Sequence, residues 1–495
     1  MPSESAVPAA GHDAAGSGVA TSLLAAFTEH AERIAVEVPA AKVKLSYRQL
    51  HQEAQNWAKK LGPPSAPLVL YVNKGADYYR LLSCAFLYGY SLCPVDRANP
   101  LMSLKRIVEQ FDRPCLVTDD IATAEHFEAV GVATLRLSGT GYSFEERGRP
   151  APRSVEPRYF ISTSGSTGVP RLVEVRHDAT SAFVAWSTRF YQCKPGSRWA
   201  QFTSIGFDLS LVDFLTVLCS GGTLVALTTA WERLHPGAFV AEHAITHWHS
   251  VPTMIPHLLR GGADLSSVQC FTFCGEPLLC ISCVQLRERA PDARIVNTYG
   301  PTEGTLFCSF HEVSDTDMNS TSPVVPIGAP IPGWSFAFIP AESHYRLVIL
   351  SEHLAEGYLN QESENFSTVS IAGQSLRSFD TGDYFSLAEG AVRFSHRKDG
   401  LIKVHGNRVD VGEVADACMA CGVQQPVLIL INKELVLFFE DPECSIDRQD
   451  LLRRLLQRLP SYAVPSKFTA MMEMPRTANG KIDRNTLAER LDIYE

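Results

Sequence analysis

A short apolar strand that runs directly into a loop of glycines and hydroxyl-bearing residues is the feature that most constrains this chain. Residues 159–161 read Tyr-Phe-Ile, and residues 162–168 read Ser-Thr-Ser-Gly-Ser-Thr-Gly. Backbone N–H groups of glycines and nearby hydroxyls can surround phosphate oxygens without a large side chain in the way. We therefore expect a loop that binds the phosphates of a nucleotide, formed by Thr163, Ser164, Gly165, Ser166, Thr167 and Gly168.

This loop is not of the Walker A type. Gly168 is followed by Val169, Pro170 and Arg171, whereas a Walker A loop requires a Lys-Ser/Thr pair at that place. Taken alone, a cluster of Ser, Thr and Gly is also typical of a plain surface loop.

Further motifs follow in a fixed order and supply other parts of a site for AMP transfer. They are Asn-Thr-Tyr-Gly-Pro-Thr-Glu at residues 297–303, Ser-Phe-Asp-Thr-Gly-Asp at 378–383, Arg-Lys-Asp-Gly at 397–400 and Asn-Gly-Lys-Ile-Asp-Arg at 479–484. With earlier elements near residues 45–50, 89–96 and 106–107, the chain resembles the acyl- and aminoacyl-adenylate-forming superfamily. Within that superfamily it resembles the adenylation domains of nonribosomal peptide synthetases, from about residue 45 to residue 484.

The resemblance implies that a substrate carboxylate attacks the α-phosphorus of ATP, which gives an acyl-adenylate and pyrophosphate. Lys481 would bridge the carboxylate and the α-phosphate, because a mobile ammonium suits two anions that move apart. Thr302 would contact the α-phosphate, and Glu303 would hold Mg²⁺, a hard cation that prefers carboxylate oxygen. ATP and Mg²⁺ are the expected cofactors.

The nucleotide site implied by the resemblance extends beyond the phosphate loop. Asp383 would accept hydrogen bonds from the ribose hydroxyls and Arg397 would assist there. Tyr299 would stack on adenine, and Asn297 would pair with its edge. The remaining residues assigned to this site are Gly275, Glu276 and Thr298.

The acyl pocket indicates the substrate class. Phe207-Asp208-Leu209-Ser210 matches the segment where amino-acid-activating members place an aspartate against the α-ammonium, and a buried carboxylate is costly unless it is paired. The alternative for Asp208 is a helix N-cap or turn residue. The residues expected to line this pocket are Asp208, Leu209, Val212, His249, Thr272, Cys274, Thr298, Leu306 and Phe307, a partly polar set that favours a small or medium polar amino acid.

Alternating β-rich and amphipathic runs predict an α/β fold: a large N-terminal body of several subdomains, with β-sheets flanked by helices, plus a small mobile α+β C-terminal domain. Strands are expected at 67–72, 223–227 and 345–350, and helices at 76–88 and 451–459. The predicted division is a disordered leader over residues 1–20, a large adenylation domain over 21–398 and a small domain over 399–495. By resemblance, the small domain swings about Asp399 and brings Lys403 and Gly406 to the site for thiol attack.

The composition argues against a nucleic-acid-binding protein and against a membrane-spanning one. The chain has 495 residues and a net charge of −10, with 44 basic and 54 acidic residues, which argues against nucleic acid as a partner. No apolar run approaches the length needed to span a bilayer. Thirteen scattered cysteines fit a reducing, cytoplasmic compartment.

Three short patterns resemble sets of metal ligands but are interpreted as packing residues. They are the two Cys-x-x-Cys pairs at 280–283 and 418–421 and the run of His243, His247 and His249.

Several positions depart from the family pattern. Arg171-Leu172 stands where Lys-Gly is usual, His396 replaces a glycine and His405 a common arginine. No attachment site for phosphopantetheine follows, so we expect transfer to a carrier protein in trans, either by a stand-alone enzyme or by an excised domain of a longer synthetase. The alternatives are an acyl- or aryl-CoA ligase, for which Asp208 would be dispensable, and a catalytically degenerate nucleotide-binding partner protein.

Overall fold

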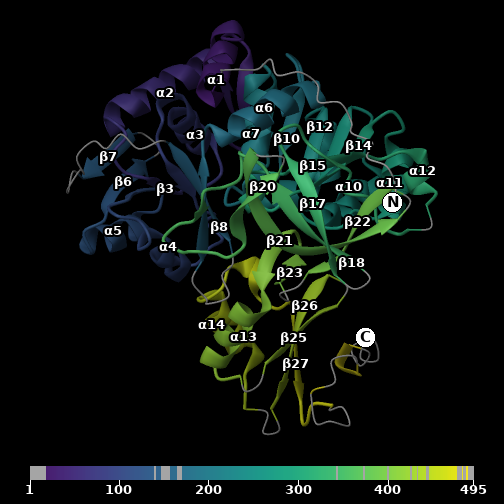
Figure 1. The fold of residues 1–495 in the computed structure, drawn as a ribbon. Helices are drawn as coiled ribbons and strands as arrows, with labels where there is room; N and C mark the ends of the chain where they lie inside the picture. The colour runs from purple at the N-terminus through teal and green to yellow at the C-terminus, as the bar shows by residue number, and fades with distance from the viewer. Residues whose placement is uncertain are drawn as a thin grey trace.

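Two large mixed sheets make up most of the N-terminal part of the chain in the computed structural model (Figure 1). The structure describes residues 18–138, 141–145, 157–163, 170–320, 322–341, 344–371, 374–388, 390–397, 401–423, 426–431, 433–441, 445–475, 482 and 486–488.

The first sheet has nine strands in the order β16-β15-β14-β13-β12-β10-β11-β1-β2, and its central strands are parallel. Parallel strands are buried on both faces of the sheet, and every residue of β12 and β13 is buried accordingly. The strands are β1 (Ile34–Val38), β2 (Val43–Ser46), β10 (Arg198–Gln201), β11 (Thr223–Ala226), β12 (His247–Ser250), β13 (Cys270–Phe273), β14 (Arg294–Tyr299), β15 (Ser309–Glu312) and β16 (Ala329–Pro330).

The second sheet has eight strands in the order β19-β9-β8-β4-β3-β5-β6-β7. These are β3 (Leu68–Tyr71), β4 (Leu92–Pro94), β5 (Cys115–Thr118), β6 (Ala133–Ser138), β7 (Gly141–Glu145), β8 (Arg158–Thr163), β9 (Arg171–Arg176) and β19 (Gly357–Tyr358). Strand β8 is the one that leads into the predicted phosphate loop, and β9 leaves it antiparallel to β8.

Helices flank these sheets. They are α1 (Val19–Glu29), α2 (Tyr47–Leu61), α3 (Ala76–Tyr88), α4 (Leu101–Val108), α5 (Ile121–Ala129), α6 (Ala179–Phe190), α7 (Leu209–Cys219), α8 (Ala230–Leu234), α9 (Pro236–Glu242), α10 (Ile255–Leu259), α11 (Cys280–Arg289) and α12 (Asp315–Met318). Helix α2 begins with a capping box, in which Ser46 and Gln49 satisfy each other's backbone N–H groups.

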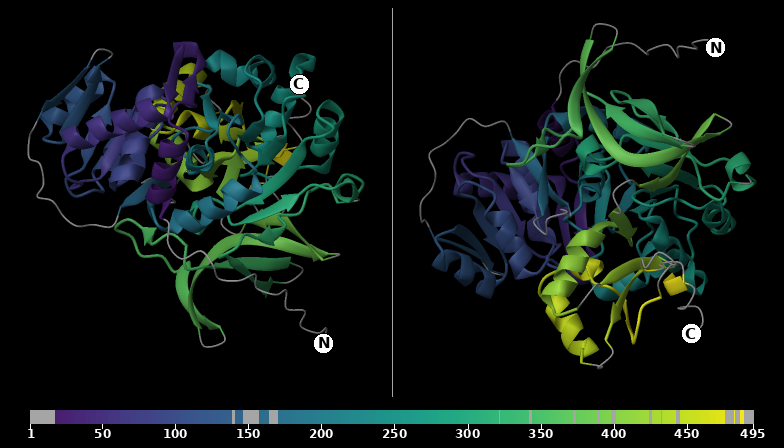
Figure 2. Two further views of the ribbon diagram at one scale, coloured as in Figure 1. Left: turned by 90° about the horizontal axis from the view of Figure 1, so that it is seen from above. Right: turned by 60° about the horizontal axis from the view of Figure 1, so that its bottom comes forward.

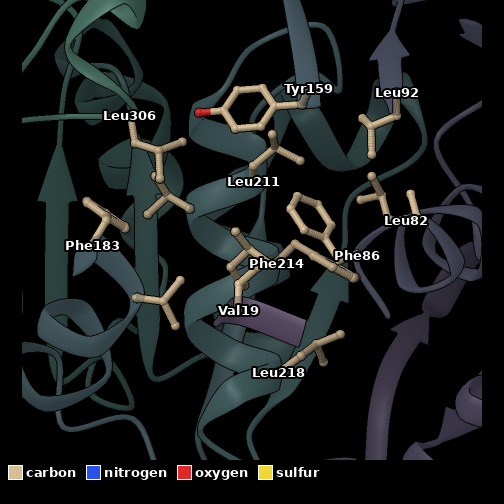
Figure 3. Packing of buried hydrophobic residues seen from close by; sticks show 14 of the residues in the cluster. Val19, Leu82, Phe86, Leu92, Tyr159, Phe183, Leu211, Phe214, Leu218 and Leu306 are labelled. Atoms are coloured by element: carbon tan, nitrogen blue, oxygen red, sulfur yellow. The ribbon is translucent and has the colours of Figure 1, made fainter. Parts of the chain in front are cut away.

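Helix α7 is the buried centre of the large body. Every residue from 210 to 218 is buried, as expected for a helix that is covered on all sides. Phe214 stacks on Tyr79 of α3 with ring centroids 6.4 Å apart, and Figure 3 shows Leu211 and Phe214 among side chains from α3, β8 and α6. The helix therefore fixes the place of the loop before it, which carries Asp208.

A third sheet, of five strands, completes the N-terminal part. It is formed by β17 (Ser335–Ala341), β18 (His344–Leu350), β20 (Phe366–Ile371), β21 (Gln374–Ala388) and β22 (Ala391–Arg397). Strand β21 carries Asp383 towards the first sheet.

The C-terminal elements have a hydrophobic core of their own and lie together on one side of the larger body (Figures 1 and 2). They are β23 (Leu401–Val404), β24 (Asn407–Asp410), α13 (Val411–Ala420), β25 (Val427–Ile431), β26 (Glu434–Glu440), α14 (Arg448–Leu456), the 3-10 helix η5 (Ser461–Ala463) and β27 (Lys467–Met471). The predicted α/β fold class, with a large body and a small α+β domain, is confirmed; the boundary at Asp399 lies outside the described residues and stays a prediction.

Two predicted boundaries were wrong. Helix α1 begins at Val19, inside the predicted leader, because Val19, Leu23 and Phe27 pack into the main core; residues 1–17 lie outside the described residues. Helix α14 begins at Arg448 and not at 451, because the Asp447 side chain accepts from the N–H groups of Gln449 and Asp450 and caps the helix there.

The predicted strands at 67–72, 223–227 and 345–350 correspond to β3, β11 and β18, and the predicted helix at 76–88 is α3. Over the described residues, no helix combines the length and apolarity needed to cross a membrane. The same residues contain no group of three or more His, Cys, Asp or Glu side chains that could hold a metal ion.

Candidate active site

A cavity lies at the carboxyl ends of β8, β13 and β14, the edge at which α/β proteins commonly bind ligands. Nine of the residues predicted to form the site line it, namely Thr163, Asp208, Leu209, Cys274, Gly275, Tyr299, Thr302, Asp383 and Gly406. The other lining residues are Ile161, Ser162, Phe207, Gly300, Pro301 and Tyr462. Segments far apart in the sequence thus meet at one site.

Asp208 lies at this cavity immediately before α7, and its side chain is almost completely buried. Its Oδ2 atom has no hydrogen-bond partner among the described residues. Burial raises the pKa of Asp208 to about 7; the Thr302 side chain lowers this pKa and the nearby Glu303 carboxylate raises it further. The site therefore favours a cation at this carboxylate.

Asp383 and Tyr299 form a second polar feature of the cavity. The Tyr299 hydroxyl donates to Oδ2 of Asp383 at 2.6 Å, and the Asp383 N–H donates to Oγ1 of Thr381 at 3.0 Å. The Tyr299 ring meets Phe385 edge to face. A carboxylate that is held in place can accept hydrogen bonds from sugar hydroxyls, and the aromatic ring beside it can pack against a base.

Glu303 is fully buried in the 3-10 helix η4 (Thr302–Gly304). Its Oε1 accepts from the Tyr358 hydroxyl at 2.5 Å. The guanidinium of Arg171 lies 5.0 Å from the centre of the Tyr358 ring. Carboxylate oxygen suits Mg²⁺, and a cation here would also relieve the repulsion between Glu303 and Asp208, so the residues fit the predicted metal.

Six predicted pocket residues are buried and are not among the residues that line the cavity: Val212, His249, Thr272, Thr298, Leu306 and Phe307. Two residues that were predicted to bind the nucleotide form hydrogen bonds with other parts of the protein. The Asn297 amide nitrogen donates to the carbonyl of Pro326 at 2.8 Å, and Oε2 of Glu276 accepts from the Thr253 N–H at 3.2 Å.

Other predicted site residues lie outside the described residues: Ser164, Gly165, Ser166, Thr167, Gly168, Asp399 and Lys481. For Arg397 and Lys403 the structure describes the strand but not the side chain. Their roles stay predictions.

The small domain contributes directly to the cavity. Gly406, in the turn between β23 and β24, has φ +81°, and a Cβ built there would lie 2.1 Å from Cγ1 of Val251. Tyr462 was missed from the sequence; its ring lies 6.1 Å from that of Phe207. No local pattern signals Tyr462, because its partner is in the other domain.

Comparison with known proteins identifies the class. The profile of a family described as AMP-binding enzyme matches residues 24–359. The chain is 29% identical over 462 residues to L-proline--[L-prolyl-carrier protein] ligase of Pseudomonas fluorescens, covering 86% of this chain and 89% of that protein. It is 30% identical over 476 residues to isonitrile lipopeptide synthase of Streptomyces coeruleorubidus, but spans only 32% of that protein's length.

Among solved structures, the fold is similar to that of AlmE, an adenylation domain of Vibrio cholerae crystallised with glycyl-adenosine-5'-phosphate. The TM-score is 0.80 at 19% identity, with 98% of this chain and 100% of that chain covered. The family match and the carrier-protein ligases among the relatives show that the chain is an AMP-forming ligase, and enzymes of this family use ATP. The chain belongs to the AMP-binding enzyme family.

Proposed function

We propose that the protein activates an amino acid as its aminoacyl-adenylate and then passes the aminoacyl group to the phosphopantetheine thiol of a carrier protein. A carboxylate oxygen of the amino acid attacks the α-phosphorus of ATP, and the bond to the β-phosphate oxygen breaks, releasing pyrophosphate. The thiol sulfur then attacks the acyl carbon, and AMP leaves. A relative named as a prolyl-carrier protein ligase supports the second step.

The observation that carries the proposal is Asp208. Its carboxylate is buried at the cavity, with one oxygen that no described residue satisfies. Such a group is costly to bury unless a cation pairs with it. The α-ammonium of an amino acid supplies that cation, whereas a fatty or aryl acid leaves the charge without a partner.

We assign the other residues the roles implied by the resemblance, and the positions of Asp383, Tyr299 and Thr302 at the cavity support theirs. Asp383, held by Tyr299, accepts from the ribose hydroxyls, and the Tyr299 ring contacts adenine. Thr302 contacts the α-phosphate, and Glu303 would hold Mg²⁺, which neutralises phosphate charge when bound. Lys481 supplies the ammonium that bridges the two reacting anions.

The small domain is proposed to serve the second step. Gly406 already lines the cavity in this structure, which supports the idea that the β23–β24 hairpin shapes the path of the thiol, with Lys403 beside it and Asp399 as the hinge. A cytoplasmic location is part of the proposal and is supported by the twelve cysteines among the described residues, all of which are free thiols.

Asp208→Asn tests the proposal. This substitution keeps the shape of the side chain and removes its charge. We expect amino-acid-dependent exchange of pyrophosphate into ATP to fall by about 100-fold or more, because a buried charge pair is broken, while ATP binding measured by calorimetry stays within about threefold of wild type. Unchanged exchange in this variant would contradict the proposal and favour a CoA ligase.

A further inference from the structure

A lysine side chain from the second sheet is hydrogen-bonded to the main chain of the first sheet. Lys74 follows β3, and its ammonium contacts three successive carbonyl oxygens at the carboxyl end of β10. The distances from Nζ are 2.5 Å to the oxygen of Gln201 and 3.1 Å to each oxygen of Phe202 and Thr203. Backbone hydrogen bonds from one side chain thus join the two sheets.

The three contacts fix the charge of Lys74. An ammonium has three N–H donors and no acceptor, whereas in a neutral amine one of the three carbonyls would face the nitrogen lone pair. Burial lowers the pKa of Lys74, and the nearby Arg233 lowers it further. Three carboxylates act in the opposite direction, those of Asp213, Asp96 and Glu232. The contacts therefore require the ammonium form.

The converging carbonyls need a cation. Carbonyl oxygens carry partial negative charge, so several that point at one place repel each other unless a positive charge lies between them. Potassium channels use rings of carbonyl oxygens in this way to replace the water around an ion. The Lys74 ammonium occupies the same kind of position at the end of β10.

The side chain of Gln201 supports this end of β10 without bringing a charge. It is fully buried, its Oε1 accepts from the Tyr79 hydroxyl at 2.9 Å, and its Nε2 donates to the carbonyl of Thr203 at 3.1 Å. An amide is a neutral donor. The positive charge at the carbonyls therefore comes from Lys74.

This part of the main chain leads to the candidate active site. Residues 202–208 join β10 to α7, and the last two of them, Phe207 and Asp208, line the cavity. Helix α7, which follows, is held in place by its burial. A change in the backbone at the end of β10 is therefore transmitted to Asp208.

A second contact from the same sheet holds this connection. The hydroxyl of Ser204 donates to Oδ2 of Asp96, which follows β4, and the N–H of Gly206 donates to the Ser204 hydroxyl at 3.3 Å. Strands β3 and β4 are parallel neighbours, so their carboxyl ends lie at the same edge of the sheet. Residues that follow these two strands thus hold the segment before Asp208 at two places.

From these contacts we propose that Lys74 is a positioning residue for amino-acid activation. Its ammonium acts as a built-in cation that holds the end of β10, and through it the segment that presents the Asp208 carboxylate to the amino acid. Lys74 itself is not among the residues that line the cavity. The inference rests on the proposed function, because it assigns a further residue to the same reaction.

Two substitutions separate the charge of Lys74 from the volume of its side chain. Lys74→Met keeps most of the volume and removes the charge, whereas Lys74→Ala also leaves space for an ion. In both variants we expect the KM for the amino acid in pyrophosphate exchange to rise by about tenfold or more, and the KM for ATP to stay within about threefold of wild type, because the lost hydrogen bonds involve a charged group that holds the Asp208 segment. An unchanged KM for the amino acid, or equal rises for both substrates, would overturn the inference.

Added cations test the role of the charge itself. Potassium or ammonium chloride should lower the amino-acid KM of Lys74→Ala by about threefold or more relative to tetramethylammonium chloride at the same ionic strength, because only the small ions fit among the carbonyl oxygens. Wild type and Lys74→Met should not respond, because their side chains fill the site. No response of Lys74→Ala, or an equal response of Lys74→Met, would overturn the role of the ammonium.

Two further variants distinguish this role from a general effect on folding. Lys44→Ala is the matched control, because Lys44 pairs with the side chain of Glu37 at 3.0 Å and not with the main chain; it should keep the wild-type KM values. Lys74→Gln keeps two N–H donors without the charge, and should raise the KM for the amino acid alone by about threefold or more even if Lys74→Ala does not fold. No rise in Lys74→Gln, or a rise in Lys44→Ala as large as that in Lys74→Ala, would overturn the inference.

Failure of the proposed function gives a different result. Absence of exchange with every amino acid in the wild-type protein would contradict amino-acid adenylation itself, and the inference would fall with it. Normal exchange in wild type, with unchanged KM values in the Lys74 variants, would overturn the role of Lys74 and leave the proposed function standing.

Discussion

The hydroxyl of Tyr358 donates a hydrogen bond to Oε1 of Glu303 at 2.5 Å. Tyr358 belongs to β19, which pairs with β9, the strand that leaves the predicted phosphate loop. Arg171, the first residue of β9, lies over the Tyr358 ring. The arrangement links the phosphate-loop strand to the carboxylate proposed to hold Mg²⁺.

Replacing Tyr358 by Phe removes this donor and keeps the ring. A hydrogen bond to a charged group is worth about 1.5–3 kcal/mol, so we expect the Mg²⁺ concentration for half-maximal pyrophosphate exchange to rise by about tenfold or more. Tyr71→Phe is the control, because the Tyr71 hydroxyl also donates to a single acceptor, the carbonyl of Asn99. An unchanged Mg²⁺ requirement in Tyr358→Phe would show that this bond does not orient Glu303.

The raised pKa of Asp208, about 7, predicts a pH dependence of amino-acid binding. Below pH 7 the carboxyl is protonated and cannot pair with an ammonium; above pH 7 it is ionised and can. The KM for the amino acid should therefore fall by about tenfold between pH 6 and pH 8, since one pH unit below the pKa leaves about a tenth of the group ionised.

Two controls isolate this titration. The KM for ATP, measured over the same range, should lack the transition at pH 7. In Asp208→Asn the amino-acid KM should be high and independent of pH over this range. A transition that persists in the variant would assign it to another group.

Gly406→Ala tests the position of the small domain. The new Cβ would lie 2.1 Å from Cγ1 and 3.0 Å from Cβ of Val251, and valine cannot move these atoms away because its side chain is stiff. We expect transfer to the carrier thiol to slow by about tenfold or more, because the hairpin no longer fits against the cavity. Adenylation, measured by pyrophosphate exchange, should change much less.

Gly422→Ala is a matched control for backbone strain. Gly422 is also in the small domain and has a φ of +93°, but a Cβ there meets nothing within 4 Å. The double variant G406A/V251A should restore transfer if the clash is the cause. If transfer does not recover in the double variant, the loss is due to the backbone conformation at residue 406 and not to the clash.

Asp383→Asn tests the nucleotide site. The amide keeps one acceptor but loses the charge and gains a donor that opposes the Tyr299 hydroxyl. We expect the KM for ATP to rise by about tenfold or more, with little change in the KM for the amino acid. An unchanged KM for ATP would contradict the ribose role of Asp383.

The sequence predicted the cavity best where one motif carries several functional residues. Tyr299 and Thr302 lie three residues apart at the end of β14, so one strand end brings both to the cavity. Asp208 was found by resemblance, because Phe207-Asp208-Leu209-Ser210 matches the segment in which amino-acid-activating members of the family place an aspartate.

Residues whose roles depend on tertiary contacts escaped prediction. Tyr358 was given no role from the sequence, because its hydrogen bond to Glu303 joins positions 55 residues apart. Asp213 was not singled out, because its burial within α7 and its hydrogen bonds with Trp199 and His249 join three separate elements. Neither contact leaves a local pattern in the sequence.

The most direct test of the central claim is exchange of labelled pyrophosphate into ATP, run with each common amino acid and with the matching acid that lacks the α-amino group. The account predicts strong exchange with at least one amino acid and at least about 100-fold weaker exchange with its des-amino counterpart, because Asp208 then keeps an unpaired buried charge. Equal or stronger exchange with the des-amino acid would contradict the account and identify an acyl- or aryl-activating enzyme.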